Sequence, residues 1–251
     1  MVYPVQRSQS YKKRTKKKKK SKVPFIISIV VILIIAMFSF IFFLYANLNN
    51  SKVLKDDRVD YVFYMKALEE IFFIRTDRKQ KINYLISIPK ISYEPIMAIS
   101  MDQPNPREIS RSVEKLFGAS ESNFYSSIDE NAYSTIKDLA TVENNPTYNT
   151  LTINDFVELI ESINLDWYEF LFFNKSKKLI AAQNEHNYTK EGAYRIINNI
   201  SKYANKEVPM TFMTKAPVKI TITDGQGSQN EYERLYIDDK SLDTIMEFMK
   251  R

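Results

Sequence analysis

The residues best suited to chemistry in this sequence are one pair of arginines and two pairs of adjacent acids. Arg107 and Arg111 stand four residues apart in a segment with helical periodicity, so both guanidinium groups can bind one phosphate. The acidic pairs at 69–70 and 238–239 carry the oxygen ligands that divalent cations prefer. Solvated side chains at helix faces and turns are the commoner explanation of all three pairs.

The common catalytic motifs are absent from the sequence. There is no P-loop, GxGxxG, GxSxG or HExxH pattern, and only four glycines are present in 251 residues. The single histidine, His186, is in a polar run and cannot build a nucleophile–base pair or a histidine zinc site. No cysteine is available for a disulfide or a metal. The residues alone therefore predict neither a catalytic set nor a metal site.

The element that organises the chain is residues 23–46, VPFIISIVVILIIAMFSFIFFLYA, which carry no charge. A helix of this length rises roughly 36 Å and crosses a hydrocarbon core of about 30 Å. We predict a single transmembrane helix there. A cleaved signal peptide is the alternative, but its apolar region would span only about 7–15 residues.

The charge distribution predicts the topology. Residues 1–22 contain ten Lys or Arg and no acid, so we expect a cytoplasmic basic tail that also binds anionic lipid headgroups. A juxtamembrane linker at 47–57 then leads to an extracellular or periplasmic domain at 58–251. Of 36 basic residues, 26 follow the tail, against 30 acids, for a net charge of −4. This domain has no electrostatic support for binding nucleic acid.

The exterior part alternates predicted strands and helices, which favours a layered α/β/α domain with a mixed sheet. Periodicity and composition predict strands at 59–66, 71–76, 81–88 and 122–129, and helices at 106–118, at 130–140 and from Thr152 onward. Further along we expect a hairpin of strands at 167–173 and 178–182, a helix at 190–204, strands at 210–214, 218–223 and 235–238, and a helix at 241–250.

The order of two segments resembles the LytR–CpsA–Psr family of cell-envelope proteins. Residues 71–93, IFFIRTDRKQKINYLISIPKISY, are similar to a family hairpin whose second strand ends in Ser-Ile-Pro-Arg-Asp-Thr-Tyr. Residues 106–140 resemble the next family block, in which a helix ending in Leu-x-Gly precedes a short strand and a second helix. The resemblance covers residues 59–140, and the single membrane anchor is similar too.

The resemblance implies a membrane-anchored protein that binds a polyprenyl-pyrophosphate-linked glycan or wall polymer for cell-wall assembly. Enzymes of this family are phosphotransferases that attach a glycopolymer to peptidoglycan, with arginines on the pyrophosphate and acids on a divalent ion such as Mg²⁺. The side chains predicted to contact an anionic ligand are Lys90, Arg107, Arg111 and Arg195.

Several family positions are replaced in this chain. Residues 87–91 read Ser-Ile-Pro-Lys-Ile, so a lysine without the bidentate fork replaces arginine and an isoleucine replaces aspartate. Residues 192–195 match only the start of the family's Ala-x-x-Tyr-x-Arg-x-Arg element, because Ile197 replaces the second arginine. Whether the transferase activity survives stays open, and Mg²⁺ is implied only if it does.

A second hypothesis is a non-enzymatic envelope scaffold whose exterior domain docks another protein. Aromatic residues of 167–173 are candidates for that interface, although core strands explain them more readily. A deep apolar groove lined by cations would favour a lipid-linked ligand, whereas a filled groove would favour the docking module.

Overall fold

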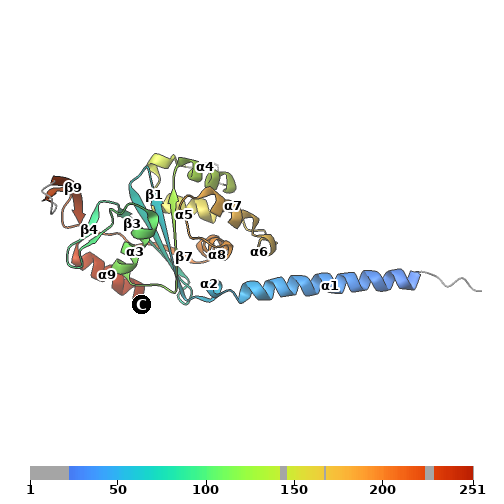
Figure 1. Ribbon diagram of the computed structural model, residues 1–251. Coiled ribbons are helices and arrows are strands. Elements are labelled where there is room, and N and C mark those ends of the chain that lie inside the picture. The colour runs from blue at the N-terminus through green and yellow to red at the C-terminus, as the bar shows by residue number, and fades with distance from the viewer. Residues whose placement is uncertain (1–22, 142–145, 167, 224–228, 251) are drawn as a thin grey trace, which may run out of the picture. The chain divides into compact units, whose positions relative to one another are not determined.

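The structure is a computed structural model that describes residues 23–141, 146–166, 168–223 and 229–250. It divides into two compact units, Met1–Phe43 and Leu44–Arg251. The first unit contains most of helix α1 (Val23–Asn49) (Figure 1). Within it, Ile26–Ala46 is long and apolar enough to cross a membrane, and none of this stretch is buried against protein. An uncovered apolar helix of this length is typical of a membrane span rather than of a core helix.

The second unit is built on a mixed five-stranded sheet in the order β6–β1–β2–β3–β7. Its strands are β1 (Arg58–Met65), β2 (Glu70–Asp77), β3 (Ile82–Pro89), β6 (Ser122–Ile128) and β7 (Ala204–Glu207). The first three form an antiparallel meander, while β6 is parallel to β1 and β7 is parallel to β3. The predicted mixed sheet is confirmed.

Both faces of this sheet are covered, so the side chains of β1 alternate between two cores. Val59, Tyr61 and Phe63 pack on one face, and Val62 and Tyr64 on the other. The first face is covered by α4 (Glu130–Leu139), α5 (Ile153–Glu161), α7 (Asn174–Ala182) and α8 (Lys190–Ile200). The second is covered by α3 (Pro106–Phe117) and α9 (Asp239–Lys250) (Figure 1). The predicted α/β/α layering is confirmed.

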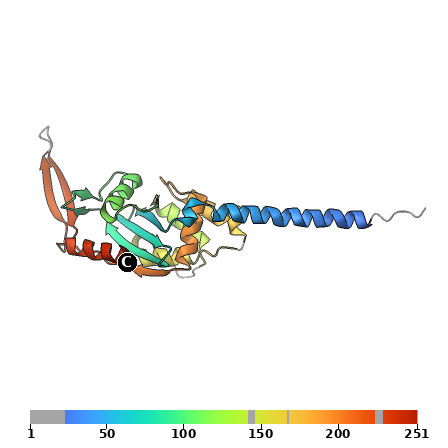
Figure 2. The same cartoon turned by 90° about the horizontal axis from the view of Figure 1, so that it is seen from below.

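A second sheet of four short strands has the order β5–β4–β9–β8. Its members are β4 (Ser92–Glu94), β5 (Ile99–Ser100), β8 (Val218–Thr223) and β9 (Gln229–Tyr236). The β8–β9 hairpin is almost wholly exposed and extends away from the rest of the second unit (Figure 2).

Several helix boundaries follow from local capping. The side chain of Asn105 accepts a hydrogen bond from the Glu108 N–H at the start of α3, and Gly118 ends this helix at φ 78°. Thr152 forms a reciprocal capping box with Asp155 on α5, and Thr189 caps α8. These signals are local, so the sequence predicted each of these boundaries.

The predicted hairpin at 167–173 and 178–182 is wrong. The described residues there form two short helices, α6 (Glu169–Phe172) and α7, separated by Phe173 in the left-handed region at φ 52°. The buried Glu169 carboxylate accepts hydrogen bonds from the N–H groups of Lys175 and Ser176, at 2.6 and 3.0 Å. This side chain caps α7 from six residues upstream, and the buried cap outweighs the β-propensity of the aromatic run.

Two further predictions needed correction. The helix expected at 190–204 ends at Ile200, because Ala204–Glu207 pairs with β3 as strand β7. The strand expected at 210–214 is reduced to one isolated bridge between Phe212 and Ile237. In both cases a partner distant in sequence decides the outcome.

Candidate functional site

The candidate site lies at one edge of the five-stranded sheet. Because β1, β3 and β6 run in the same direction, their carboxyl ends meet at this edge, beside the start of β2. In open α/β sheets, ligands bind at the carboxyl ends of strands. Among the charged side chains of the loops and helix starts there, we call six the rim: Lys66, Glu69, Lys90, Asp102, Arg107 and Glu185.

Lys90 follows β3 directly and is the centre of the rim. Its backbone N–H donates to the Glu69 carbonyl at 2.8 Å, which fixes the end of β3 beside the β1–β2 turn. Its Nζ lies 3.5 Å from Glu69 Oε2 and 3.6 Å from Asp102 Oδ1, and 5.3 Å from the centroid of the Tyr64 ring. The lysine side chain is only 19% exposed. It is a half-buried cation between two carboxylates and an aromatic face.

The protonation of Lys90 follows from these neighbours. Burial by itself lowers the pKa of Lys90, but the nearby Tyr64 hydroxyl and the Glu69 and Asp102 carboxylates outweigh burial, and the pKa is raised. Lys90 is therefore a cation throughout the physiological range. Burial also raises the pKa of the Tyr64 phenol, which stays neutral and donates to Glu69 Oε1 at 3.3 Å.

Arg107 lies on the same rim, in the first turn of α3. It is exposed and lines an open pocket of about 330 Å³ together with Asn105, Pro106, Tyr125, Glu185 and His186. Glu185 also forms an ion pair with Lys66 at 3.8 Å, which links this pocket to the end of β1. The rim thus holds three cations and three carboxylates, and an anion must compete with the carboxylates for its cations.

The other two predicted cations lie elsewhere. Arg111 is exposed one turn further along α3, and its Nη1 donates to Glu108 at 2.7 Å. Arg195 is buried in α8, and its guanidinium donates to the backbone carbonyls of Val53 and Asp56. Lys90 and Arg107 therefore lie at the same edge of the five-stranded sheet. Arg195 instead binds the backbone around α2 (Lys52–Lys55), near the start of the second unit.

Neither acidic pair gathers a metal-binding set. Among the residues that the structure describes, no group of three His, Asp or Glu side chains is arranged to hold a metal ion. The Glu69 carboxylate pairs with Lys90 and accepts a hydrogen bond from the Tyr64 hydroxyl. The Ser87 hydroxyl donates to Glu70 at 2.9 Å. Asp238 accepts from the Lys240 N–H at the start of α9. In this structure, carboxylates of both pairs contact cations and hydrogen-bond donors of the chain itself.

The space between the sheet and α5 and α8 is filled by aromatic rings. Phe63 packs edge-on against Phe156 with centroids 4.9 Å apart, and Tyr188 stacks on Phe124 at 5.3 Å. Tyr61 stacks on Phe124 at 5.5 Å. All five side chains are buried. This part of the interior is a packed core rather than a groove.

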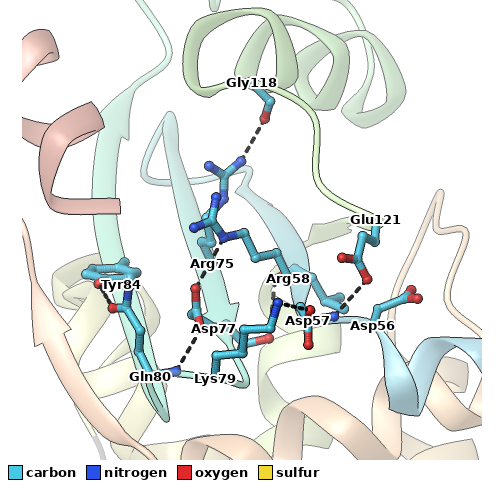
Figure 3. A network of polar contacts seen from close by, with 12 residues as sticks. Asp56, Asp57, Arg58, Arg75, Asp77, Lys79, Gln80, Tyr84, Gly118 and Glu121 are labelled. Atoms are coloured by element: carbon cyan, nitrogen blue, oxygen red, sulfur yellow. Dashed lines mark hydrogen bonds and ion pairs between the residues drawn. The ribbon is translucent and has the colours of Figure 1, made fainter. Parts of the chain in front are cut away.

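Sequence reasoning missed a buried ion pair at the opposite edge of the sheet. Arg75 donates to Asp60 from Nε and Nη2, both at 2.7 Å, and to the carbonyls of Phe117 and Gly118 at 3.0 and 2.7 Å. Figure 3 shows Arg75 reaching Gly118, next to a surface network that contains Arg58 and Asp77. A sequence signal existed, because Asp60 and Arg75 interrupt segments that are otherwise largely apolar, and the register of β1 and β2 makes them cross-strand partners.

No family model matches this chain, and no curated protein matches it. Among solved structures, fragment 52–321 of Lmo1026 from Listeria monocytogenes, described as a transcriptional factor, is 14% identical with a TM-score of 0.50. That match covers 80% of this chain and 97% of the other. It shows a shared fold.

Two Bacillus subtilis proteins are also similar in structure. TagT is 11% identical over 78% of this chain and 91% of its own, with a TM-score of 0.46, and it has also been solved bound to LI-WTA. TagV is 8% identical over 77% of this chain and 95% of its own, with a TM-score of 0.49.

Proposed function

We propose that this chain is a membrane-anchored cell-envelope protein that binds a polyprenyl-pyrophosphate-linked glycan or wall polymer without transferring it. The observation that carries the proposal is the position of Lys90. It follows Ser87-Ile88-Pro89 at the carboxyl end of β3, where the LytR–CpsA–Psr-like hairpin would place its arginine, and it shares the rim with Arg107. A raised pKa keeps Lys90 cationic for an anionic ligand.

The same edge of the sheet supports the proposal that the protein does not transfer its ligand. Phosphoryl transfer needs cations and a metal ion placed to stabilise developing charge. On the rim, Lys90 is already neutralised by Glu69 and Asp102, and the described carboxylates do not gather around a metal position. Binding with little or no catalysis is the function that this arrangement supports.

The membrane topology belongs to the same proposal. The candidate span and the basic tail support a cytoplasmic N-terminus, with the domain from residue 58 onward outside the cell membrane.

The test is binding of the full chain in detergent to a polyprenyl pyrophosphate, with and without Mg²⁺. We expect saturable binding. Lys90→Ala should weaken the affinity about tenfold, because it removes one charge-assisted contact that contributes ~1.4 kcal/mol. Lys115→Ala is the matched control, because Lys115 is an exposed lysine of α3 outside the rim. Unchanged affinity in Lys90→Ala would remove the rim from the proposal.

The second candidate function is a scaffold that docks another envelope protein, and the aromatic packing between the sheet and α5 and α8 favours it. A polyprenyl chain would need an apolar groove, and the rings of Phe63, Phe156 and Tyr188 occupy this one. The β8–β9 hairpin, with Ile222 and Tyr232 exposed, is the surface for such a partner. A photo-crosslinker at Ile222 should then yield one discrete adduct in cells.

A further inference from the structure

Two aromatic side chains, one just before α6 and one at its end, are exposed. Phe172 is 55% exposed and Tyr168 is 37% exposed, and their ring centroids are 6.5 Å apart. Together they form an apolar tip on the surface of the second unit. A hydrophobic tip beside polar surface marks a place that contacts another apolar phase or partner.

The tip is held firmly by its surroundings. Glu169, the first residue of α6, is buried and its carboxylate caps α7 through Lys175 and Ser176. Phe173 is buried at the other end of α6, where its ring packs edge-on against Tyr194 at 5.8 Å and under Lys190 Nζ at 5.0 Å. The exposed rings therefore project from an anchored turn.

Helix α8 places this tip near the start of the second unit. Tyr194 contacts the end of α6, and the next residue, Arg195, binds the carbonyls of Val53 and Asp56 around α2 (Lys52–Lys55). A helix is only about 10 Å across, and α6 and α2 contact adjacent residues of α8, so they lie on neighbouring sides of α8. In Figure 1, α6 and α2 both lie beside α8.

A short tether then limits how far this face can be from the membrane. The candidate span ends at Ala46 and α2 begins at Lys52. The chain between them can extend by no more than about 20 Å. If residues 26–46 span the membrane, this length keeps α2, and with it the elements that contact α2, within about 20 Å of the bilayer surface.

Exposed lysines lie near the tip, together with two carboxylates that are not buried. Lys177 and Lys178 of α7 are exposed, as are Lys52 and Lys202, while the Glu169 carboxylate is buried. Asp166 pairs with Lys175 Nζ at 3.3 Å, and Glu161 lines a pocket with Lys202. Aromatic residues with adjacent lysines are typical of segments that lie in the headgroup region of a membrane. We propose that Tyr168 and Phe172 insert into the interfacial layer of the lipid bilayer, with these lysines on anionic headgroups.

The single tryptophan provides a direct test. Trp167 precedes Tyr168 and is the only tryptophan in the chain, so its emission reports on this segment alone. The full chain is reconstituted into phosphatidylcholine–phosphatidylglycerol vesicles with or without bromine at carbons 6 and 7 of the acyl chains. We expect bromine to quench the emission by about half, as for an indole at the membrane interface.

Two variants make the test selective. Tyr168→Ser/Phe172→Ser should lose most of the quenching, whereas Ile222→Ser/Tyr232→Ser on the β8–β9 hairpin, at the other end of the unit, should keep it (Figures 1 and 2). Wild-type emission that bromine does not quench would overturn the proposal and point to a protein partner for α6. Equal quenching in both variants would overturn it as well.

The inference depends on the membrane span of the proposed function but not on glycan binding. The vesicles contain no polyprenyl lipid, so a failure to bind glycan leaves the quenching unaffected. Extraction of the same vesicles with alkaline carbonate tests the span separately.

Discussion

At the scale of single residues, the neighbours of Lys90 decide what the rim can do. A family arginine would keep a bidentate fork for phosphate, whereas Lys90 is a point charge that Glu69 and Asp102 already neutralise. The lysine was predicted from the hairpin resemblance. Its two carboxylate partners were not, because Asp102 reaches it only through the loop that carries β4 and β5.

The buried pair of Asp60 and Arg75 is the other decisive residue-scale feature. Both side chains are almost fully buried, and Arg75 also satisfies the last carbonyls of α3. The pair thus joins α3 to the sheet at the edge opposite the rim. Removing one partner of a buried pair leaves an uncompensated charge, which costs more than the pair itself contributes.

We expect Arg75→Met to destabilise the fold by about 3–5 kcal/mol, because the Asp60 carboxylate would remain buried without its cation. Urea unfolding of the full chain in mild detergent, followed by circular dichroism, measures the change. Arg111→Ala is the control, since its exposed pair with Glu108 should contribute about 1 kcal/mol or less.

The double variant Arg75→Met/Asp60→Leu tests the mechanism. It removes both charges, so it should be more stable than Arg75→Met alone. A double variant that is no more stable than the single one would show that the loss comes from the bonds of Arg75 to α3 rather than from the unpaired Asp60 carboxylate.

At the scale of elements, the contact between α8 and β6 depends on one glycine. A Cβ placed on Gly192 would lie 2.7 Å from Cζ of Phe124, and the Phe124 ring packs against both Tyr61 and Tyr188. The Tyr61 hydroxyl also donates to the Gly192 carbonyl at 3.4 Å. Helix and sheet approach this closely because no side chain intervenes.

We therefore expect Gly192→Ala to destabilise the fold by about 1–3 kcal/mol through overpacking, despite the better helix propensity of alanine. Thermal unfolding of the full chain measures the effect. Phe124→Leu should relieve the clash, so the double variant should lose less stability than the sum of the two single variants. Strict additivity would contradict the contact.

At the scale of the whole molecule, the prediction concerns which side of the membrane each part occupies. The basic tail predicts a cytoplasmic N-terminus, and the candidate span in α1 is the element that separates the two sides. The chain contains no cysteine, so a single introduced thiol reports its own location.

We expect a membrane-impermeant maleimide to label intact cells that carry Ser201→Cys but not those that carry Ser8→Cys. Ser201 is exposed at the end of α8, and Ser8 belongs to the basic tail. Both should react after the cells are lysed, which controls for thiol reactivity. The reverse labelling pattern would place the domain in the cytoplasm and exclude a role in the cell envelope.

The sequence by itself determined what local patterns specify. Enrichment in β-branched and aromatic residues predicted strand β1, Thr152 and Gly118 marked helix ends, and the uncharged run from residue 23 to 46 predicted the span. These outcomes depend on neighbours within a few residues, where side-chain period, capping and apolar length act directly. The hairpin resemblance also brought Lys90 to attention.

Only the tertiary structure decided which distant residues meet. Strand β7 forms because residues 204–207 pair with β3, more than a hundred residues earlier in the chain. Asp60 faces Arg75, and Arg195 turns inward to Val53 and Asp56 instead of toward a ligand. Each outcome depends on a partner brought close by packing, and the pattern along one segment carries no information about that partner.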